Sequence, residues 1–216
     1  MSHAVGPLLR LALRPRVQGA ANVPAEGPFI LASNHLSFVD SFVLSPVIPR
    51  RVVYLAKSDY FELPGRSGRC VAWCMLALGN VPIRRGPRRA AVRALEQAAS
   101  VLASGEVVGI YPEGTRSLDG RLYRGRTGVG WLALTTGVPV LPVALGGTDR
   151  IMPTGAWRPR LRVRPTVRIG EPMDFSRYRD LHPAKARRAV TDEVMETIRK
   201  LSGQRYTGRY NPGADA

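Results

Sequence analysis

The chain has 216 residues, of which 44% are hydrophobic, and this is the size and composition of one globular domain. Its two cysteines form neither a disulfide framework nor a metal-ligand pattern, so we expect no metal and no bound cofactor. The formal net charge of +16 favours contact with anionic lipids, anionic cofactors or nucleic acid. No apolar run reaches the ~18 residues of a membrane-spanning helix.

Apolar runs bounded by turn residues predict buried strands, and apolar residues at helical spacing predict helices between them. The expected strands are 29–33, 52–56, 81–83, 107–111, 140–145, 161–164 and 166–169. The expected helices are 38–47, 66–78, 87–104, 131–136 and 183–201. The helix at 87–104 should form a crossover unit with the strands on either side of it. This alternation predicts a single α/β domain with a mixed, largely parallel sheet flanked by helices.

The two ends of the chain differ from this domain. Residues 1–18 mix leucines and arginines, which predicts either a short helix at a membrane interface or a helix packed on the domain. Residues 19–203 form the domain itself. Residues 204–216 are polar and rich in glycine and proline, and we expect a flexible tail there.

The segment from Asn34 to Asp40 follows the first strand and carries His35, the only histidine placed for catalysis. In a continuous helix a separation of five residues puts two side chains about 140° apart. His35 and Asp40 can meet if His35 lies in the turn before a helix and Asp40 in its first turns, and Ser37 is a suitable N-cap for that helix. Asp40 would then fix the tautomer of His35 and leave its other nitrogen as a general base. The alternative is a capping histidine beside an unrelated aspartate.

A second polar segment follows the strand at 107–111, with the sequence Glu113-Gly114-Thr115-Arg116-Ser117. It offers backbone N–H groups, hydroxyls and a guanidinium at one strand end, where open α/β sheets place their chemistry. This set suits a phosphate monoester. Two alternatives stay open, because Glu113 could cap a loop and Ser117 could cap a helix.

Four blocks in this order resemble the glycerolipid acyltransferases, in particular the 1-acylglycerol-3-phosphate acyltransferases. The blocks are Asn34–Asp40, Val81–Arg84, Glu113–Ser117 and Val138–Val143. The second block is the loosest, and either Arg84 or Arg85 could supply its arginine. The resemblance implies that His35 and Asp40 are catalytic. It also implies a site for the acceptor's glycerol phosphate, made of Arg84, Glu113, Gly114, Thr115, Arg116 and Ser117.

The reaction implied by this resemblance is acyl transfer from a thioester of coenzyme A or acyl carrier protein to a hydroxyl of lysophosphatidate, giving phosphatidate. Another lysolipid or a glycolipid acceptor would fit the same blocks. We expect direct transfer without an acyl-enzyme. The expected location is the cytoplasmic side of the cell membrane, where the protein would bind an anionic lipid surface peripherally.

The clustered arginines leave other partners open. Arginines at 158, 160, 162 and 164 alternate with other residues, so on a strand they would share one face. That face is either a solvated edge or a site for lipid headgroups or coenzyme A phosphates. A basic nucleic-acid-binding protein is the alternative from another class. We expect no nucleic acid, because that function leaves His35, Asp40 and Glu113 unexplained.

Overall fold

The computed structural model, which describes residues 2–57, 61–62, 64–77, 79–83, 88–153, 155–156, 158–160 and 162–214, contains one seven-stranded sheet. The strands are β1 (Arg16–Gln18), β2 (Ile30–Ser33), β3 (Val52–Lys57), β4 (Asn80–Ile83), β5 (Val107–Ile110), β6 (Val140–Gly146) and β7 (Thr166–Ile169). Their order in the sheet is β1-β7-β6-β2-β5-β3-β4. Strands β2 to β6 run parallel, whereas β1 and β7 run together in the opposite direction. The mixed, largely parallel sheet expected from the sequence is confirmed.

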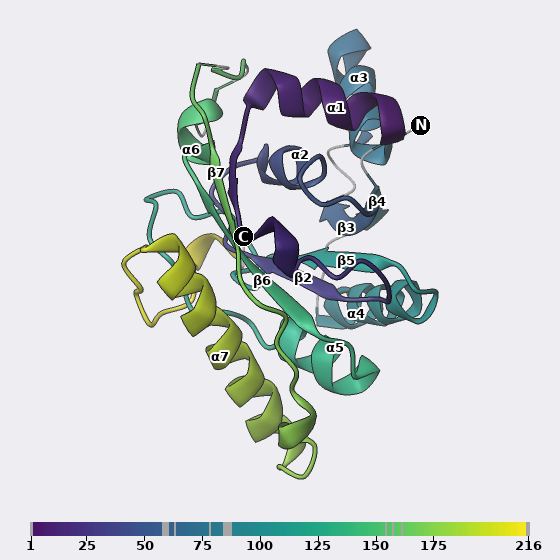
Figure 1. Ribbon diagram of the computed structural model, residues 1–216, viewed down its shortest axis with the longest axis vertical. Helices are drawn as coiled ribbons and strands as arrows, with labels where there is room; N and C mark the ends of the chain where they lie inside the picture. Colours follow the sequence, from purple (N-terminus) through teal and green to yellow (C-terminus); the bar gives the residue numbers. More distant parts are fainter. Residues whose placement is uncertain are drawn as a thin grey trace.

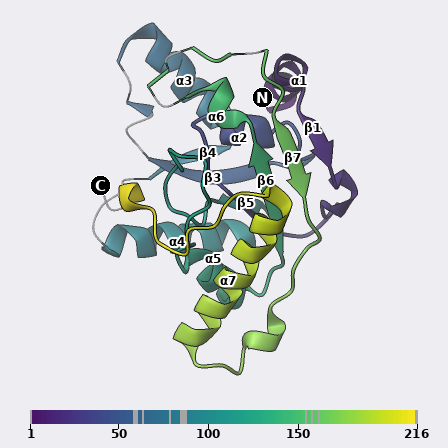
Figure 2. The same ribbon diagram turned by 90° about the vertical axis from the view of Figure 1, so that its left-hand side faces the viewer.

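Helices cover both faces of this sheet (Figures 1 and 2). The helices are α1 (Ser2–Leu13), α2 (Asp40–Leu44), α3 (Gly65–Ala77), α4 (Arg88–Ala103), α5 (Gly128–Thr136), α6 (Thr148–Ile151) and α7 (Pro183–Ser202). Helices α1, α2 and α6 contribute buried residues to one core cluster, and α4, α5 and α7 contribute to another on the opposite face. Among the described residues, no helix is both long and apolar enough to cross a membrane.

Strand β2 lies in the middle of the sheet and is buried on both faces. Leu31 packs into the first core cluster, and its neighbours Ile30 and Ala32 pack into the second. An apolar run without polar alternation is what a strand covered on both faces requires. Strand β2 pairs with β5, and Ala32 lies opposite Ile110. The segments that follow these two strands therefore leave the sheet side by side, at its carboxyl edge.

The observed elements differ from the predicted ones in several places. Helix α2 is shorter than the predicted 38–47. Strand β3 lies between β4 and β5, so the crossover through α4 joins strands that are not neighbours. The predicted strand at 161–164 is wrong, because residues 162–164 form a turn and bend; position 161 lies outside the described residues. Strand β1 was not predicted, because its three residues form a strand only by pairing with β7.

The C-terminal segment also differs from the loose tail that its composition predicts. The Leu122 N–H donates to the carbonyl of Arg205, and the Thr207 N–H donates to the carbonyl of Leu122. Asn211 is only 5% exposed. Figure 2 shows this segment returning from α7 over the loops at the carboxyl edge of the sheet. The last residues of the fold are therefore packed against the same edge as His35.

Candidate active site

His35 and Asp40 meet at the carboxyl end of β2, as their spacing predicts. The Nδ1 atom of His35 lies 2.8 Å from the Oδ2 atom of Asp40. The Asp40 side chain is fully buried, whereas 17% of the His35 side chain is exposed. An ionised carboxylate only accepts hydrogen bonds, so Nδ1 carries the proton and Nε2 keeps a lone pair. Within the described part of the chain no hydrogen bond occupies Nε2, which can therefore take a proton from a hydroxyl.

Asp40 also closes the turn that carries His35. Its Oδ2 atom accepts hydrogen bonds from the backbone N–H groups of Leu36 and Ser37, at 2.7 and 2.9 Å. Asp40 is the first residue of α2, whose N-cap makes no side-chain hydrogen bond. The predicted cap at Ser37 is wrong, because the Ser37 hydroxyl instead donates to the carbonyl of Met152 at 2.8 Å.

The second polar segment is tied to this turn through both backbone groups of His35. The Oε1 atom of Glu113 accepts the His35 N–H at 3.0 Å, and the Ser117 N–H donates to the His35 carbonyl at 2.7 Å. The Oε2 atom of Glu113 accepts the N–H of Tyr123 at 2.9 Å. Glu113 is 1% exposed, so it braces two loops. This is the loop-capping alternative for Glu113.

Burial strongly affects this glutamate. It raises the pKa of Glu113 to about 7, although the N–H donors of Tyr123 and His35 act to lower it. An ionised carboxylate accepts hydrogen bonds strongly through both oxygens, whereas a protonated one is a weaker acceptor and gains one O–H donor. Because burial favours the neutral form, this carboxyl changes its protonation state close to neutral pH while it joins the two loops.

The middle of the second segment forms a partly exposed turn. Gly114 has a φ of 80°, in the left-handed region that glycine adopts without a steric penalty. Its N–H donates to the carbonyl of Tyr111 at 3.0 Å. Thr115 and Arg116 follow and are both partly exposed. Among the described residues nothing forms a hydrogen bond or ion pair with the Arg116 guanidinium, so an anionic ligand can reach it.

The remaining predicted site residues are placed differently. Ser117 is 2% exposed, and its hydroxyl donates to Asp119 at 3.1 Å. No helix begins there, so the capping alternative for Ser117 is wrong. The predicted second cation, Arg84, and its alternative Arg85 lie outside the described residues. Where the chain is described, no group of three His, Cys, Asp or Glu side chains could hold a metal ion.

Asn34 fixes the position of the residue just before His35. Its Nδ2 atom donates to the carbonyl of Leu145 at 2.9 Å, and its Oδ1 atom accepts the N–H of Leu145 at 2.7 Å. The same Nδ2 atom donates to Oε1 of Gln204 at 2.8 Å. Asn34 is fully buried. Its amide thus continues the pairing between β2 and β6 beyond the end of β2.

An aromatic stack lies against the imidazole of His35. The ring centroids of His35 and Tyr111 are 4.0 Å apart with an angle of 11° between the planes, and Tyr111 stacks in turn on Tyr54 at 5.8 Å. Strands β3 and β5 pair so that Tyr54 lies opposite Gly109. A Cβ atom on Gly109 would lie 2.1 Å from the Tyr54 ring. Gly109 therefore makes room for the stack, and the face of Tyr111 favours a positively charged imidazolium.

The two tyrosines were not predicted as site residues. Their hydroxyls, and the Oδ1 atom of Asp40, are buried without a hydrogen-bond partner among the described residues. Burial is the main cause that raises the pKa of both tyrosines, and the charge of Asp40 adds to it. The signal in the sequence was the spacing of two between Gly109 and Tyr111, which puts both on one face of a strand.

Known proteins resemble this chain over most of its length. The family described as Acyltransferase matches residues 14–146. A chloroplastic 1-acyl-sn-glycerol-3-phosphate acyltransferase of Brassica napus is 37% identical over 141 residues, which cover 65% of this chain and 39% of that protein. The 1-acyl-sn-glycerol-3-phosphate acyltransferase alpha of Homo sapiens is 31% identical over 134 residues, which cover 62% and 46%. The chain thus spans less than half the length of these two relatives.

The fold has a solved counterpart. The crystal structure of the 1-acyl-sn-glycerophosphate acyltransferase PlsC from Thermotoga maritima aligns with a TM-score of 0.69 and 29% sequence identity. The alignment covers 93% of this chain and 79% of that chain. The structural similarity therefore extends beyond residues 14–146 into the C-terminal third.

Proposed function

Because the chain belongs to the acyltransferase family, we propose that it transfers a fatty acyl group from an acyl thioester to the free hydroxyl of 1-acylglycerol-3-phosphate. The product would be phosphatidate, a precursor in phospholipid biosynthesis. The observation that carries this proposal is the contact between His35 and Asp40, braced against the Glu113–Ser117 turn. The names of the relatives from Brassica napus and Thermotoga maritima support the acceptor.

In the proposed mechanism the Nε2 atom of His35 takes the proton of the acceptor hydroxyl. The oxygen attacks the thioester carbonyl, and the tetrahedral intermediate collapses as the C–S bond breaks. The imidazolium returns its proton to the departing thiolate. Asp40 holds the Nδ1 proton and stabilises the imidazolium, and the Tyr111 ring adds to that stabilisation through its face.

The acceptor phosphate would bind at the turn next to this pair. Arg116 has no competing partner in the described structure, and the left-handed Gly114 brings the backbone of the turn close to a ligand. We assign Arg84 or Arg85 the role of a second cation from the resemblance alone. Thr115 would donate its hydroxyl to the glycerol phosphate. Glu113 and Ser117 would act by holding the turn, because both are buried.

The donor would be a thioester of coenzyme A or of acyl carrier protein. A thioester is already activated, and its thiolate leaves without strong acid help, so direct transfer needs no acyl-enzyme. The many surface arginines suit either donor, because coenzyme A carries phosphates and acyl carrier proteins are acidic.

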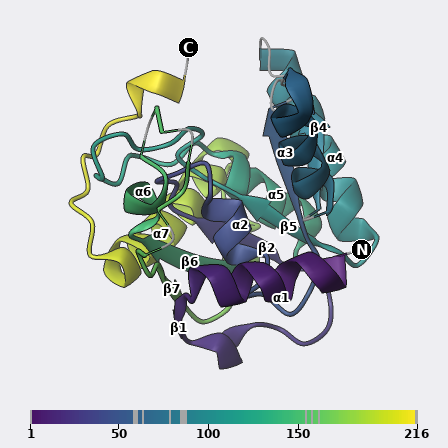
Figure 3. The same ribbon diagram turned by 90° about the horizontal axis from the view of Figure 1, so that it is seen from above.

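The lipid acceptor implies that the protein works at a membrane surface, which we place on the cytoplasmic side. Leu8 and Leu11 on α1 are 67% and 68% exposed. Trp73 and Leu76 on α3 are also exposed, and α1 contacts both α3 and α2. Figure 1 shows α1 and α3 together at the top of the molecule, and Figure 3 looks onto this end from above. Because α2 begins with Asp40, a lipid surface on α1 would lie next to the candidate site.

The test is acyl transfer by the purified chain, with labelled palmitoyl-coenzyme A or palmitoyl-acyl carrier protein as donor. The acceptors are lysophosphatidate, another lysolipid and a phosphate-free monoacylglycerol, and the products are identified by mass spectrometry. We expect acylation of lysophosphatidate, and a 10²–10⁴-fold lower kcat for His35→Ala if His35 is the general base.

A folded His35→Ala variant with the turnover of the wild type would overturn the mechanism. A wild-type protein that acylates no acceptor but binds nucleic acid tightly, and less so at high salt, would replace the enzyme with the nucleic-acid alternative.

A further inference from the structure

The C-terminal strap, defined here as residues 203–214, follows α7 and lies across the loops of the candidate site. It lies outside residues 14–146, the part of the chain that matches the family. Its first residue, Gly203, ends α7 with a φ of 71°, which turns the chain back toward the sheet. In Figure 2 the strap, in yellow, runs from the upper end of α7 past the sheet to the C-terminus at the left.

Gln204 at the start of the strap connects two loops of the site. Its Oε1 atom accepts a hydrogen bond from Asn34, the buried residue before His35, at 2.8 Å. Its Nε2 atom donates to the carbonyl of Gly120 at 2.7 Å. One side chain thus links the turn of His35 to the loop that follows Ser117.

The middle of the strap pairs with the loop that supports Glu113. Leu122 and Tyr206 form a parallel bridge, and the Arg124 N–H donates to the carbonyl of Arg209 at 2.8 Å. Tyr123, which lies between Leu122 and Arg124, donates its N–H to Glu113. The strap therefore holds the segment that contains Tyr123, whose N–H is one of the two backbone donors bonded to Glu113.

Asn211 fixes the other end of the strap on the phosphate-binding turn. Its Nδ2 atom donates to the carbonyl of Arg116 at 3.1 Å, and its Oδ1 atom accepts the N–H of Gly213 at 3.2 Å. Asn211 is 5% exposed, so water does not readily replace these bonds. The backbone of Arg116 is thus attached to a residue 95 positions later in the sequence.

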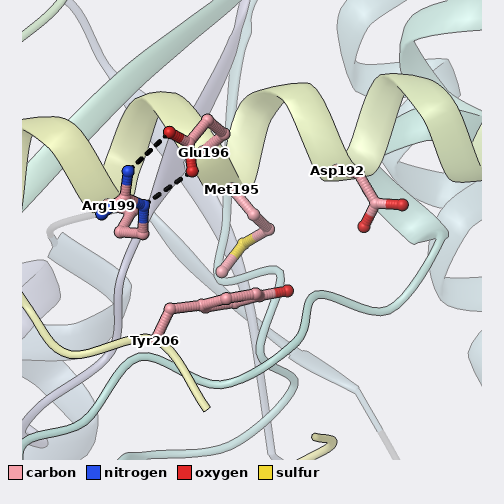
Figure 4. A pocket seen from close by; sticks show the side chains of 5 residues that line it. All are labelled: Asp192, Met195, Glu196, Arg199 and Tyr206. Atoms are coloured by element: carbon pink, nitrogen blue, oxygen red, sulfur yellow. Dashed lines mark hydrogen bonds and ion pairs between the residues drawn. The ribbon is translucent and has the colours of Figure 1, made fainter. Parts of the chain in front are cut away.

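The strap contacts α7 at Tyr210, whose hydroxyl accepts a hydrogen bond from Arg188, and leaves a pocket beside the helix at Tyr206. A pocket of about 230 Å³ separates Tyr206 from the helix and is lined by Asp192, Met195, Glu196, Arg199 and Tyr206. Figure 4 shows the Tyr206 ring facing Met195 across this space, with the ion pair of Glu196 and Arg199 beside it. Contacts to α7 and to the site loops both hold the strap, and the hydrogen bonds of Gln204 and Asn211 are the ones that reach the turns of His35 and Arg116.

From these contacts we infer that the strap is part of the catalytic machinery, and that Gln204 and Asn211 are positioning residues for the proposed acyl transfer. Gln204 acts through Asn34 on the turn of His35 and so affects the chemical step. Asn211 acts through the carbonyl of Arg116 and so affects binding of the acceptor phosphate. The expected effects on kcat and KM rest on the proposed function, whereas the expected effects on hydrogen exchange of the site loops do not.

The experiment compares Gln204→Ala and Asn211→Ala in the full chain with two matched controls. Gln18→Ala removes a glutamine that bonds Arg168, and Asn22→Ala removes an asparagine whose amide donates to the carbonyl of Ile169. One net hydrogen bond corresponds to a change of about 3–10-fold. We expect Gln204→Ala to lower kcat by that factor with little change in the acceptor KM. Asn211→Ala should raise the acceptor KM by the same factor with kcat nearly unchanged.

Hydrogen exchange measured by mass spectrometry gives a second readout that needs no substrate. Gln204→Ala should speed exchange in the peptide covering residues 33–38, and Asn211→Ala in the peptide covering 113–118, whereas neither control should change them. Variants that match their controls in both kinetics and exchange would overturn the inference. If the wild type transfers no acyl group, the proposed function has failed and the exchange result alone decides the role of the strap.

Discussion

At the level of single residues, Arg116 tests the phosphate site most directly. A charge-assisted hydrogen bond contributes roughly 1.5–3 kcal/mol, so Arg116→Ala should raise the KM for lysophosphatidate about 10–100-fold. The KM for the acyl donor should stay nearly the same. Steady-state kinetics with each substrate varied in turn measures both values.

The control for this change is Arg177→Ala, which removes an arginine that bonds Glu193 on α7. Its KM values should match those of the wild type. Arg116 would be structural rather than substrate-binding if Arg116→Ala lost as much activity on a phosphate-free monoacylglycerol as on lysophosphatidate.

Glu113 makes stability depend on pH. Its pKa is about 7 in the folded protein and near the ordinary value of 4.5 in the unfolded chain. Between these values the folded protein holds a proton that the unfolded chain has released, so the free energy of unfolding falls as pH rises. The contribution lost between pH 4.5 and 7 is ~3 kcal/mol.

Glu113→Gln removes this titration. Relative to the wild type, the variant should therefore gain stability as pH rises from 4.5 to 7, although its amide can accept only one of the two backbone N–H groups. Urea unfolding of both proteins across this range measures the difference. A constant difference at all pH values would show that Glu113 does not titrate there.

The residues of the site were predictable where their partners lie nearby in the sequence. His35 and Asp40 are five positions apart, and the geometry of a turn before a helix allowed the contact that the structure shows, while the other blocks of the sequence favoured it. The bonds of Glu113 to His35 and of Asn211 to Arg116 span 78 and 95 positions. Such pairs depend on which strands are neighbours, and the spacing of residues does not contain that information.

At the level of elements, burial decided what the sequence could predict. Strands β2, β5 and β6 have apolar runs long enough to be identified without their neighbours. Alternation alone was not sufficient at 161–164, where residues 162–164 form a turn and carry exposed arginines instead of a strand. The resemblance to acyltransferases, which rested on four short blocks, is confirmed by the family match.

The fit between β3 and β5 can be tested with Gly109→Ala. The new Cβ atom would lie 2.1 Å from the Tyr54 ring, which must move and disturb its stack with Tyr111. We expect a loss of roughly 1–3 kcal/mol in unfolding free energy, measured by urea denaturation, together with a lower kcat.

Gly128→Ala is the matched control. A Cβ there would be tight only against the end of the flexible Leu95 side chain, at 3.3 Å, and would lie at an ordinary 3.8 Å from Ile110, so the change should be mild. If Gly109→Ala were as stable and active as Gly128→Ala, the aromatic stack would have no part in the function.

At the level of the whole molecule, charge and exposed leucines should combine in membrane binding. The composition predicted the charge, but only the structure shows which leucines are exposed. Each basic residue near an anionic surface contributes about 1 kcal/mol. The protein should therefore sediment with vesicles that contain anionic lipid, and ~1 M salt should release much of it because the screening length falls to about 3 Å.

Substituting the exposed leucines of α1 separates the contribution of hydrophobic insertion to membrane binding from that of electrostatic attraction. Leu8→Ser with Leu11→Ser should weaken vesicle binding at least ~10-fold, because burying one leucine contributes roughly 1.5–3 kcal/mol. Leu181→Ser, which changes an exposed leucine just before α7, should have no effect. Equal binding to neutral and anionic vesicles, unchanged by salt, would reject the electrostatic contribution.

The pairing of β1 with β7 has a consequence for how the chain folds during synthesis. Strand β1 is made early, but Arg16 pairs with Thr166, which is translated 150 residues later. At ~5–20 residues per second, a ribosome takes roughly 8–30 s to cover that distance. The five parallel strands between them can assemble from residues 30–146 in the meantime. During that interval β1 has no strand partner, and the leucine-rich helix before it is open to a chaperone or a lipid surface.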